Sequence, residues 1–111
     1  MEDCVFCKII KGELPSTTLY KDKDFVIIKD INPSAKVHLL AIPTNHVPYI
    51  DMMTEEGAAY LGKIMLKISK MQEELGITEG YRLCINQGEN ANQPVGHVHI
   101  HTLGGEKLKD N

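Results

Sequence analysis

The pattern of apolar residues changes its period several times along this chain of 111 residues, and each change marks a predicted element. The clearest is an amphipathic helix over residues 54–75, where apolar residues recur three or four positions apart. Thr54 is a suitable N-cap, and Gly76 is a suitable C-terminal stop. Glu55 and Glu56 suit the positive end of the helix. We expect the apolar stripe to face the core rather than to form a partner groove; it consists of Ala58, Leu61, Ile64, Met65, Ile68, Met71 and Leu75.

Five further segments have the composition of β-strands bounded by turn residues. They are residues 17–20, 25–29, 37–42, 81–87 and 95–103. A short helix is expected over residues 4–11, a polar loop over residues 88–94 and a frayed tail over residues 104–111. Because strands lie on both sides of one long helix, the sequence predicts a single α+β domain, residues 1–111, with a mainly antiparallel sheet.

Composition narrows the class of function. Apolar residues make up 42% of the chain and charged residues 24%, with a net charge of −3, which is typical of a globular protein without a patch for bulk nucleic acid. No segment has the length of a membrane span, and the acidic start lacks the pattern of a signal peptide. The three cysteines argue against a disulfide framework, and Cys84 has the setting of a small buried residue. We therefore expect a cytoplasmic protein.

Three histidines alternate near the C-terminus, at His97, His99 and His101. In a strand they share one face, while Val98 and Ile100 share the other and can pack into the core. Three imidazoles on one face suit a zinc ion, or a nucleophile that attacks phosphorus with its neighbours as proton donors. A merely solvent-facing strand is disfavoured, because adjacent imidazoles repel each other as they protonate.

Two other patterns carry chemistry. Residues 86–93 are rich in amide side chains and precede the histidines, so they can supply neutral donors to a phosphate. Cys4 and Cys7 form a Cys-x-x-Cys pair, which can be redox-active, bind zinc or consist of two buried thiols. The redox interpretation lacks the βαβ context, and zinc requires two more ligands.

These motifs together resemble the histidine triad (HIT) family, whose mark is three histidines separated by single apolar residues. Here that mark is His97-Val-His99-Ile-His101-Thr-Leu. The similarity extends to residues 4–15, to the segment Asp30-Ile-Asn-Pro33, to residues 38–46 and to the loop that contains Asn86. The whole pattern is most similar to the Hint branch, the nucleoside phosphoramidases.

The resemblance implies a five-stranded antiparallel sheet with two helices, and a homodimer that joins two sheets into one. It implies hydrolysis of the P–N bond of nucleoside 5′-monophosphoramidates, with AMP- or GMP-type purine nucleotides as ligands. His99 would be the nucleophile that carries the nucleotide, His101 would contact phosphate and assist the leaving group, and His97 would orient the site or bind metal. The chemical step itself needs no metal.

The family's binding residues carry over in the same way. Asp30 would accept hydrogen bonds from the ribose hydroxyls. The phosphate would be contacted by Asn86, Gln93 and the Val95 backbone. The purine pocket would be lined by Phe6, Ile9, Leu14, Ile28 and Ile31, each of which would also suit a core. Some members bind structural zinc through positions that match Cys4, Cys7, His46 and His97. His38 would belong to a structural strand without a further role.

One position departs from the pattern. Pro94 stands where the branch usually has Ser or Thr, and proline offers no hydroxyl donor. Slower turnover is expected. Alternatives are a dinucleoside polyphosphate hydrolase, a non-catalytic nucleotide-binding scaffold, and a zinc hydrolase that uses all three triad histidines.

Overall fold

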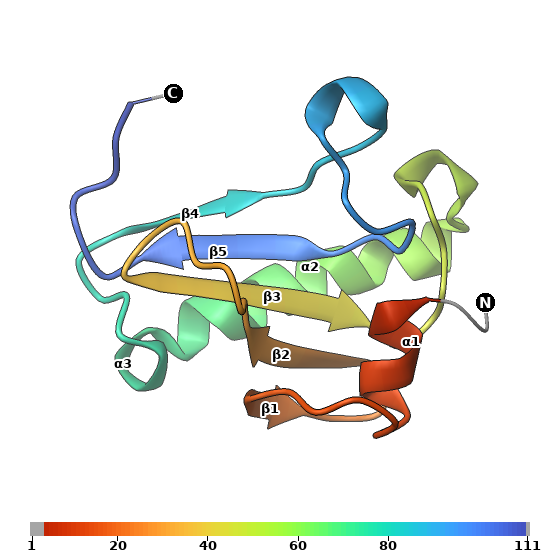
Figure 1. Cartoon of the computed structure of the whole chain (residues 1–111), viewed down its shortest axis with the longest axis horizontal. Coiled ribbons are helices and arrows are strands. Elements are labelled where there is room, and N and C mark those ends of the chain that lie inside the picture. The colour runs from red at the N-terminus through yellow and green to blue at the C-terminus, as the bar shows by residue number, and fades with distance from the viewer. Residues whose placement is uncertain (1–3, 111) are drawn as a thin grey trace.

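The computed structural model describes residues 4–110; residues 1–3 of the expected acidic start and Asn111 of the expected tail lie outside the described residues. Its centre is a five-stranded antiparallel sheet in the order β1-β2-β3-β5-β4 (Figure 1). The strands are β1 (Thr18–Lys21), β2 (Phe25–Lys29), β3 (Val37–Pro43), β4 (Tyr81–Cys84) and β5 (Ile100–Gly104). The helices are α1 (Val5–Ile10), α2 (Glu55–Lys70) and α3 (Gln72–Leu75), with 3-10 turns at Ile50–Met52 and Glu89–Ala91. The predicted α+β class and five-stranded antiparallel sheet are confirmed.

The long helix starts as predicted but does not run unbroken to residue 75. The Thr54 hydroxyl accepts a hydrogen bond from the Gly57 amide at 3.0 Å. Met71 leaves helical geometry, with φ −105° and ψ 20°, so that α3 forms a separate turn, which ends at Gly76 with φ 76°. Of the predicted stripe, Ala58 and Met65 are exposed, which corrects their assignment to the core. Helical spacing gives the direction of a stripe, but only the line of closest approach to the sheet is buried.

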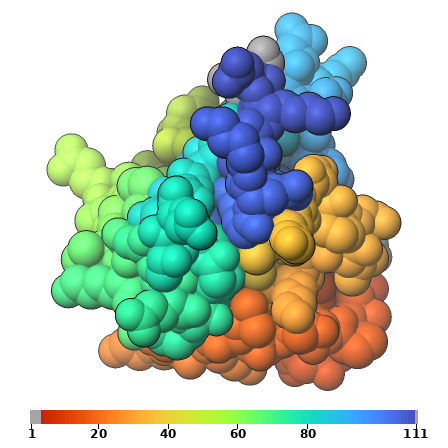
Figure 2. Space-filling model, turned by 90° about the vertical axis from the view of Figure 1, so that its left-hand side faces the viewer, coloured from red at the N-terminus to blue at the C-terminus, as the bar shows by residue number. Residues whose placement is uncertain are grey.

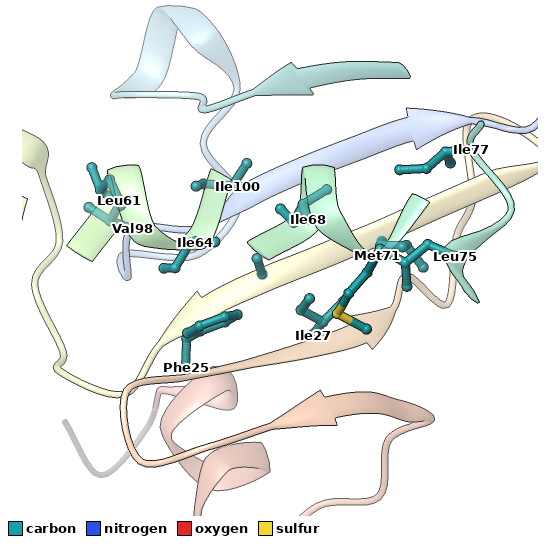
Figure 3. Packing of buried hydrophobic residues seen from close by; sticks show 12 residues of the cluster. Phe25, Ile27, Leu61, Ile64, Ile68, Met71, Leu75, Ile77, Val98 and Ile100 are labelled. Atoms are coloured by element: carbon teal, nitrogen blue, oxygen red, sulfur yellow. The ribbon is translucent and has the colours of Figure 1, made fainter. Parts of the chain in front are cut away.

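The two faces of the sheet bury two separate clusters. Between the sheet and α2 lies the larger core, which Figure 3 shows with Ile64 and Ile68 of α2 against Phe25 and Ile27 of β2. The opposite face carries the smaller cluster, which lies beneath α1 and consists of Phe6, Val26, Ile28, Leu40 and Ile42. Burial on both faces explains why β2 and β3 are nearly continuous apolar runs.

The C-terminal tail makes two hydrogen bonds to the body of the protein, and most of its described residues are exposed. The Lys36 amide donates to Glu106 Oε2 at 2.6 Å, and Arg82 Nη2 donates to the Lys109 carbonyl at 3.0 Å. Figure 2 shows the tail lying across the end of the molecule, against the segment that joins α3 to β4. In the described part of the chain, no helix combines the length and apolarity required to cross a membrane.

Candidate active site and metal cluster

The triad begins before its strand. β5 starts at Ile100, so of the three histidines only His101 lies in the ladder, and the predicted strand over residues 95–103 is too long at its start. The predicted strand over residues 81–87 likewise ends at Cys84. The expected alternation nevertheless holds, because Val98 and Ile100 join the core beneath α2. The Val98 amide bonds to the Val47 carbonyl at 2.8 Å, which keeps the chain extended where no ladder partner is available.

The ring of His99 is oriented by the backbone carbonyl of His97, two residues earlier in the chain. Its Nδ1 lies 2.7 Å from the His97 carbonyl, which can only accept, so Nδ1 carries the proton. Nε2 therefore has a free lone pair, and this atom is buried without a partner among the described residues. Phe6 packs edge-on against the ring, with centroids 4.8 Å apart. Burial lowers the pKa of His99, which favours the neutral ring that a nucleophile needs.

His101 lies beside His99, with ring centroids 4.9 Å apart. Its Nε2 is also buried and unpartnered, so two ring nitrogens lack a protein ligand at one place. Burial, followed by the neighbouring His99 and His38, lowers the pKa of His101 to about 4. Both imidazoles are consequently neutral near pH 7.

His38 is a site residue that the sequence interpretation missed. It is 8% exposed on β3, and its Nε2 lies 2.9 Å from His101 Nδ1 and 3.3 Å from Asp30 Oδ2. Strand alternation offered a signal, because His38, Leu40 and Ile42 occupy alternate positions of β3 and therefore share the face that α1 covers.

The four predicted metal ligands come together at the N-terminus of α1. The donor atoms of Cys4, Cys7, His46 and His97 all lie within 4.8 Å of one another. His97 Nδ1 is 3.5 Å from Cys4 Sγ and 3.7 Å from Cys7 Sγ, and His46 Nδ1 is 3.2 Å from Cys7 Sγ. The set has the composition of a closed Cys₂His₂ zinc site.

The ring of His97 fits a metal ligand. Its Nε2 lies 2.7 Å from the Pro43 carbonyl and donates to it, which leaves the Nδ1 lone pair facing the two sulfurs. Burial, with a further contribution from Cys4, raises the pKa of the Cys7 thiol, so a cation is needed to favour the thiolate. Because the Pro43 carbonyl and the two sulfurs already occupy both nitrogens of His97, the geometry argues against one zinc ion shared by the three triad histidines.

The predicted nucleotide pocket is brought together in part. Phe6 and Ile28 belong to the cluster beneath α1, and Ile9 packs against it. Leu14 and Ile31 stand outside it, 36% and 90% exposed. Asp30, the predicted ribose-binding residue, directly follows β2. Its Oδ1 accepts a hydrogen bond from the Asn32 amide at 2.8 Å.

The amide-rich loop, residues 86–93, is held in place by hydrogen bonds of the Gln93 side chain. Gln93 Oε1 accepts the Gly88 amide at 2.8 Å, and Gln93 Nε2 donates to the carbonyls of Pro48 and Val95 at 2.9 and 3.2 Å. Its side chain is therefore occupied in holding the loop. A cavity of about 570 Å³ lies against the C-terminal tail, and no predicted site residue lines it.

Comparison with known proteins agrees with this arrangement. A family model described as scavenger mRNA decapping enzyme C-terminal binding matches residues 3–109. Protein HitA of Neisseria gonorrhoeae is 42% identical over 104 residues, which cover 94% of this chain and 97% of that protein. A HIT family hydrolase from Clostridium thermocellum has a TM-score of 0.93 at 48% identity, covering 100% of this chain and 97% of the other. A zinc-bound histidine triad family protein from Mycobacterium smegmatis has a TM-score of 0.83 at 32% identity, covering 95% and 76%.

Proposed function

The chain belongs to the histidine triad (HIT) family, and on that premise we propose that it hydrolyses the P–N bond of purine nucleoside 5′-monophosphoramidates through a nucleotidyl-histidine intermediate. The observation that carries the proposal is the pair of unpartnered, buried nitrogens, Nε2 of His99 and Nε2 of His101. Native proteins rarely leave buried polar atoms unpaired, and such a pair is the natural place for ligand atoms.

The chemistry follows from the protonation of His99. Its Nε2 lone pair attacks phosphorus, the N–P bond to His99 forms, and the P–N bond of the substrate breaks as its nitrogen takes a proton from water and leaves as the neutral amine. Water then attacks the phosphorus of the intermediate, which releases the nucleoside monophosphate and the free imidazole. The His97 carbonyl keeps the proton on Nδ1 of His99, so Nε2 remains available for each turnover.

The remaining residues bind and orient. In this proposal Asp30 accepts hydrogen bonds from the ribose hydroxyls. Asn86 and the Val95 backbone contact the phosphate, and Gln93 acts by holding the loop in place. The purine lies against Phe6, Ile9 and Ile28 and covers Leu14 and the exposed Ile31. Zinc held by Cys4, Cys7, His46 and His97 would stabilise the start of α1 and would not enter the reaction. We also propose a homodimer.

Hydrolysis of adenosine 5′-phosphoramidate by the wild type and by His99→Ala tests the proposal. Mass spectrometry of the quenched wild-type reaction is expected to find adenylate on His99, and the variant is expected to lose both turnover and adduct while still binding AMP. Turnover that survives in His99→Ala, or an adduct on another residue, would overturn it.

A second candidate is a nucleotide-binding scaffold without turnover. The exposed Pro94 favours it, since this position supplies no hydroxyl to the phosphate or leaving group. Binding of AMP by a wild-type protein that forms no adduct and no product would select this function.

A further inference from the structure

His38 is buried beside the triad, and the mechanism above gives it no task. It lies on β3, between the carboxylate of Asp30 and the ring of His101. A buried imidazole with partners on both nitrogens has a defined proton position, which its partners determine.

The partner of Nδ1 can only donate. The backbone amide of Ser34 lies 2.9 Å from His38 Nδ1, so that nitrogen accepts and holds no proton. In the neutral ring the proton is then on Nε2. Both groups near Nε2 are suitable acceptors, with His101 Nδ1 at 2.9 Å and Asp30 Oδ2 at 3.3 Å.

The proton position of His38 in turn determines which nitrogen of the neutral His101 ring is protonated. Because His101 Nδ1 accepts the Nε2–H of His38, the proton of the neutral His101 ring must be on its Nε2. That atom is the buried, unpartnered nitrogen beside His99. The chain Ser34 N–H, His38, His101 thus delivers one N–H to the place where the phosphoryl group would lie.

We propose that His38 is a positioning residue that holds His101 as a neutral hydrogen-bond donor, with its Nε2–H directed at the phosphoryl group. This inference deepens the proposed function and rests on it for the identity of the ligand. His101 then stabilises charge on a phosphoryl oxygen as a neutral hydrogen-bond donor, while its Nδ1 accepts the hydrogen bond from His38. The arrangement pairs a nitrogen with a lone pair, on His99, with a nitrogen that carries a hydrogen, on His101.

The hydrogen bonds also argue against a metal at this second cluster. Donor atoms of Asp30, His38 and His101 lie close enough to surround a cation. A metal on His38 Nε2 would require that nitrogen to lose its proton and Nδ1 to gain one, opposite the Ser34 amide. The cluster is therefore better described as a proton-ordered chain.

Two variants separate the donor from the bulk of His38. His38→Gln can place an amide N–H near the position of Nε2, whereas His38→Leu fills similar space without a donor. We expect His38→Leu to lower kcat for adenosine 5′-phosphoramidate about ten- to hundredfold, by analogy with the loss of a hydrogen-bond partner that orients a metal-bound histidine. KM is expected to change little, and His38→Gln to recover most of the loss.

The tautomer itself is measured in the resting protein. The ¹⁵N NMR spectrum of the wild type is expected to show His101 protonated on Nε2, and His38→Leu to show a mixture or a protonated ring. A wild-type His101 protonated on Nδ1 would overturn the inference even if His38→Leu failed to fold. So would a kcat for His38→Leu equal to that of the wild type, or no recovery in His38→Gln. Because NMR needs no turnover, failure of the proposed reaction is distinguishable from failure of the proton-ordered chain.

Discussion

Acid is expected to destabilise this protein through His101, and the size of the effect can be worked out. Burial lowers the pKa of the folded-state ring to about 4, against an ordinary value of 6.5. Between these two values the unfolded chain binds a proton that the folded chain does not. The contribution of the neutral His101 ring to the free energy of unfolding is therefore fully present above pH 6.5, and it is lost progressively as the pH falls towards 4.

For one group with these two pKa values, the loss between pH 7 and pH 4.5 is about 2 kcal/mol. That is a substantial share of the roughly 5–15 kcal/mol by which domains of this kind are stable. His101→Gln removes the titration while keeping a polar side chain of similar size. The variant is expected to lose about 2 kcal/mol less on acidification than the wild type.

Urea unfolding of both proteins at pH 7 and at pH 4.5 measures this double difference. Contributions from the metal ligands and from other titrating groups occur in both proteins and cancel in the comparison. Equal losses of unfolding free energy in the wild type and His101→Gln would refute the claim that His101 is held neutral by burial.

Three further outcomes are expected. Ile68→Ala, at a fully buried core position, lowers the unfolding free energy by about 2–5 kcal/mol, whereas the control Met65→Ala, on the exposed side of α2, changes it by no more than about 0.5 kcal/mol. Cys7→Ser lowers the zinc content of the purified protein and its Tm, while Cys84→Ser alters neither, as elemental analysis and thermal melts can check. Pro94→Ser raises kcat/KM by restoring a hydroxyl donor, and steady-state kinetics that show no gain would dismiss that explanation.

The sequence was informative wherever a local period decides the structure. Alternation placed Val98 and Ile100 in the core, away from the triad face, although the ladder begins only at Ile100. It did not predict the start of that strand, because Val98 bonds to Val47, far away in the sequence. Helical spacing gave the buried line of α2 but not its width, which depends on how closely the helix approaches the sheet.

Long-range pairing also explains two side-chain contacts that the sequence did not reveal. His38 contacts His101 only because β3 and β5 are neighbours, a register that strand composition does not specify. From the sequence, the side-chain amide of Gln93 is expected to donate a hydrogen bond to a phosphate. In the structure this amide donates instead to the carbonyl of Pro48, which lies 45 positions earlier in the chain.

The cluster of Cys4, Cys7, His46 and His97 is joined to His99, the proposed nucleophile, through His97. Its ring nitrogens meet the cysteine sulfurs and the Pro43 carbonyl, and its backbone carbonyl fixes the proton of His99. Phe6, between Cys4 and Cys7 in α1, packs against the rings of both histidines. A buried polar atom without a partner is costly, and these contacts satisfy every ring nitrogen of His97 and one of His99. The nitrogens that stay unpaired on His99 and His101 are therefore a cost concentrated where a bound phosphoryl group would relieve it.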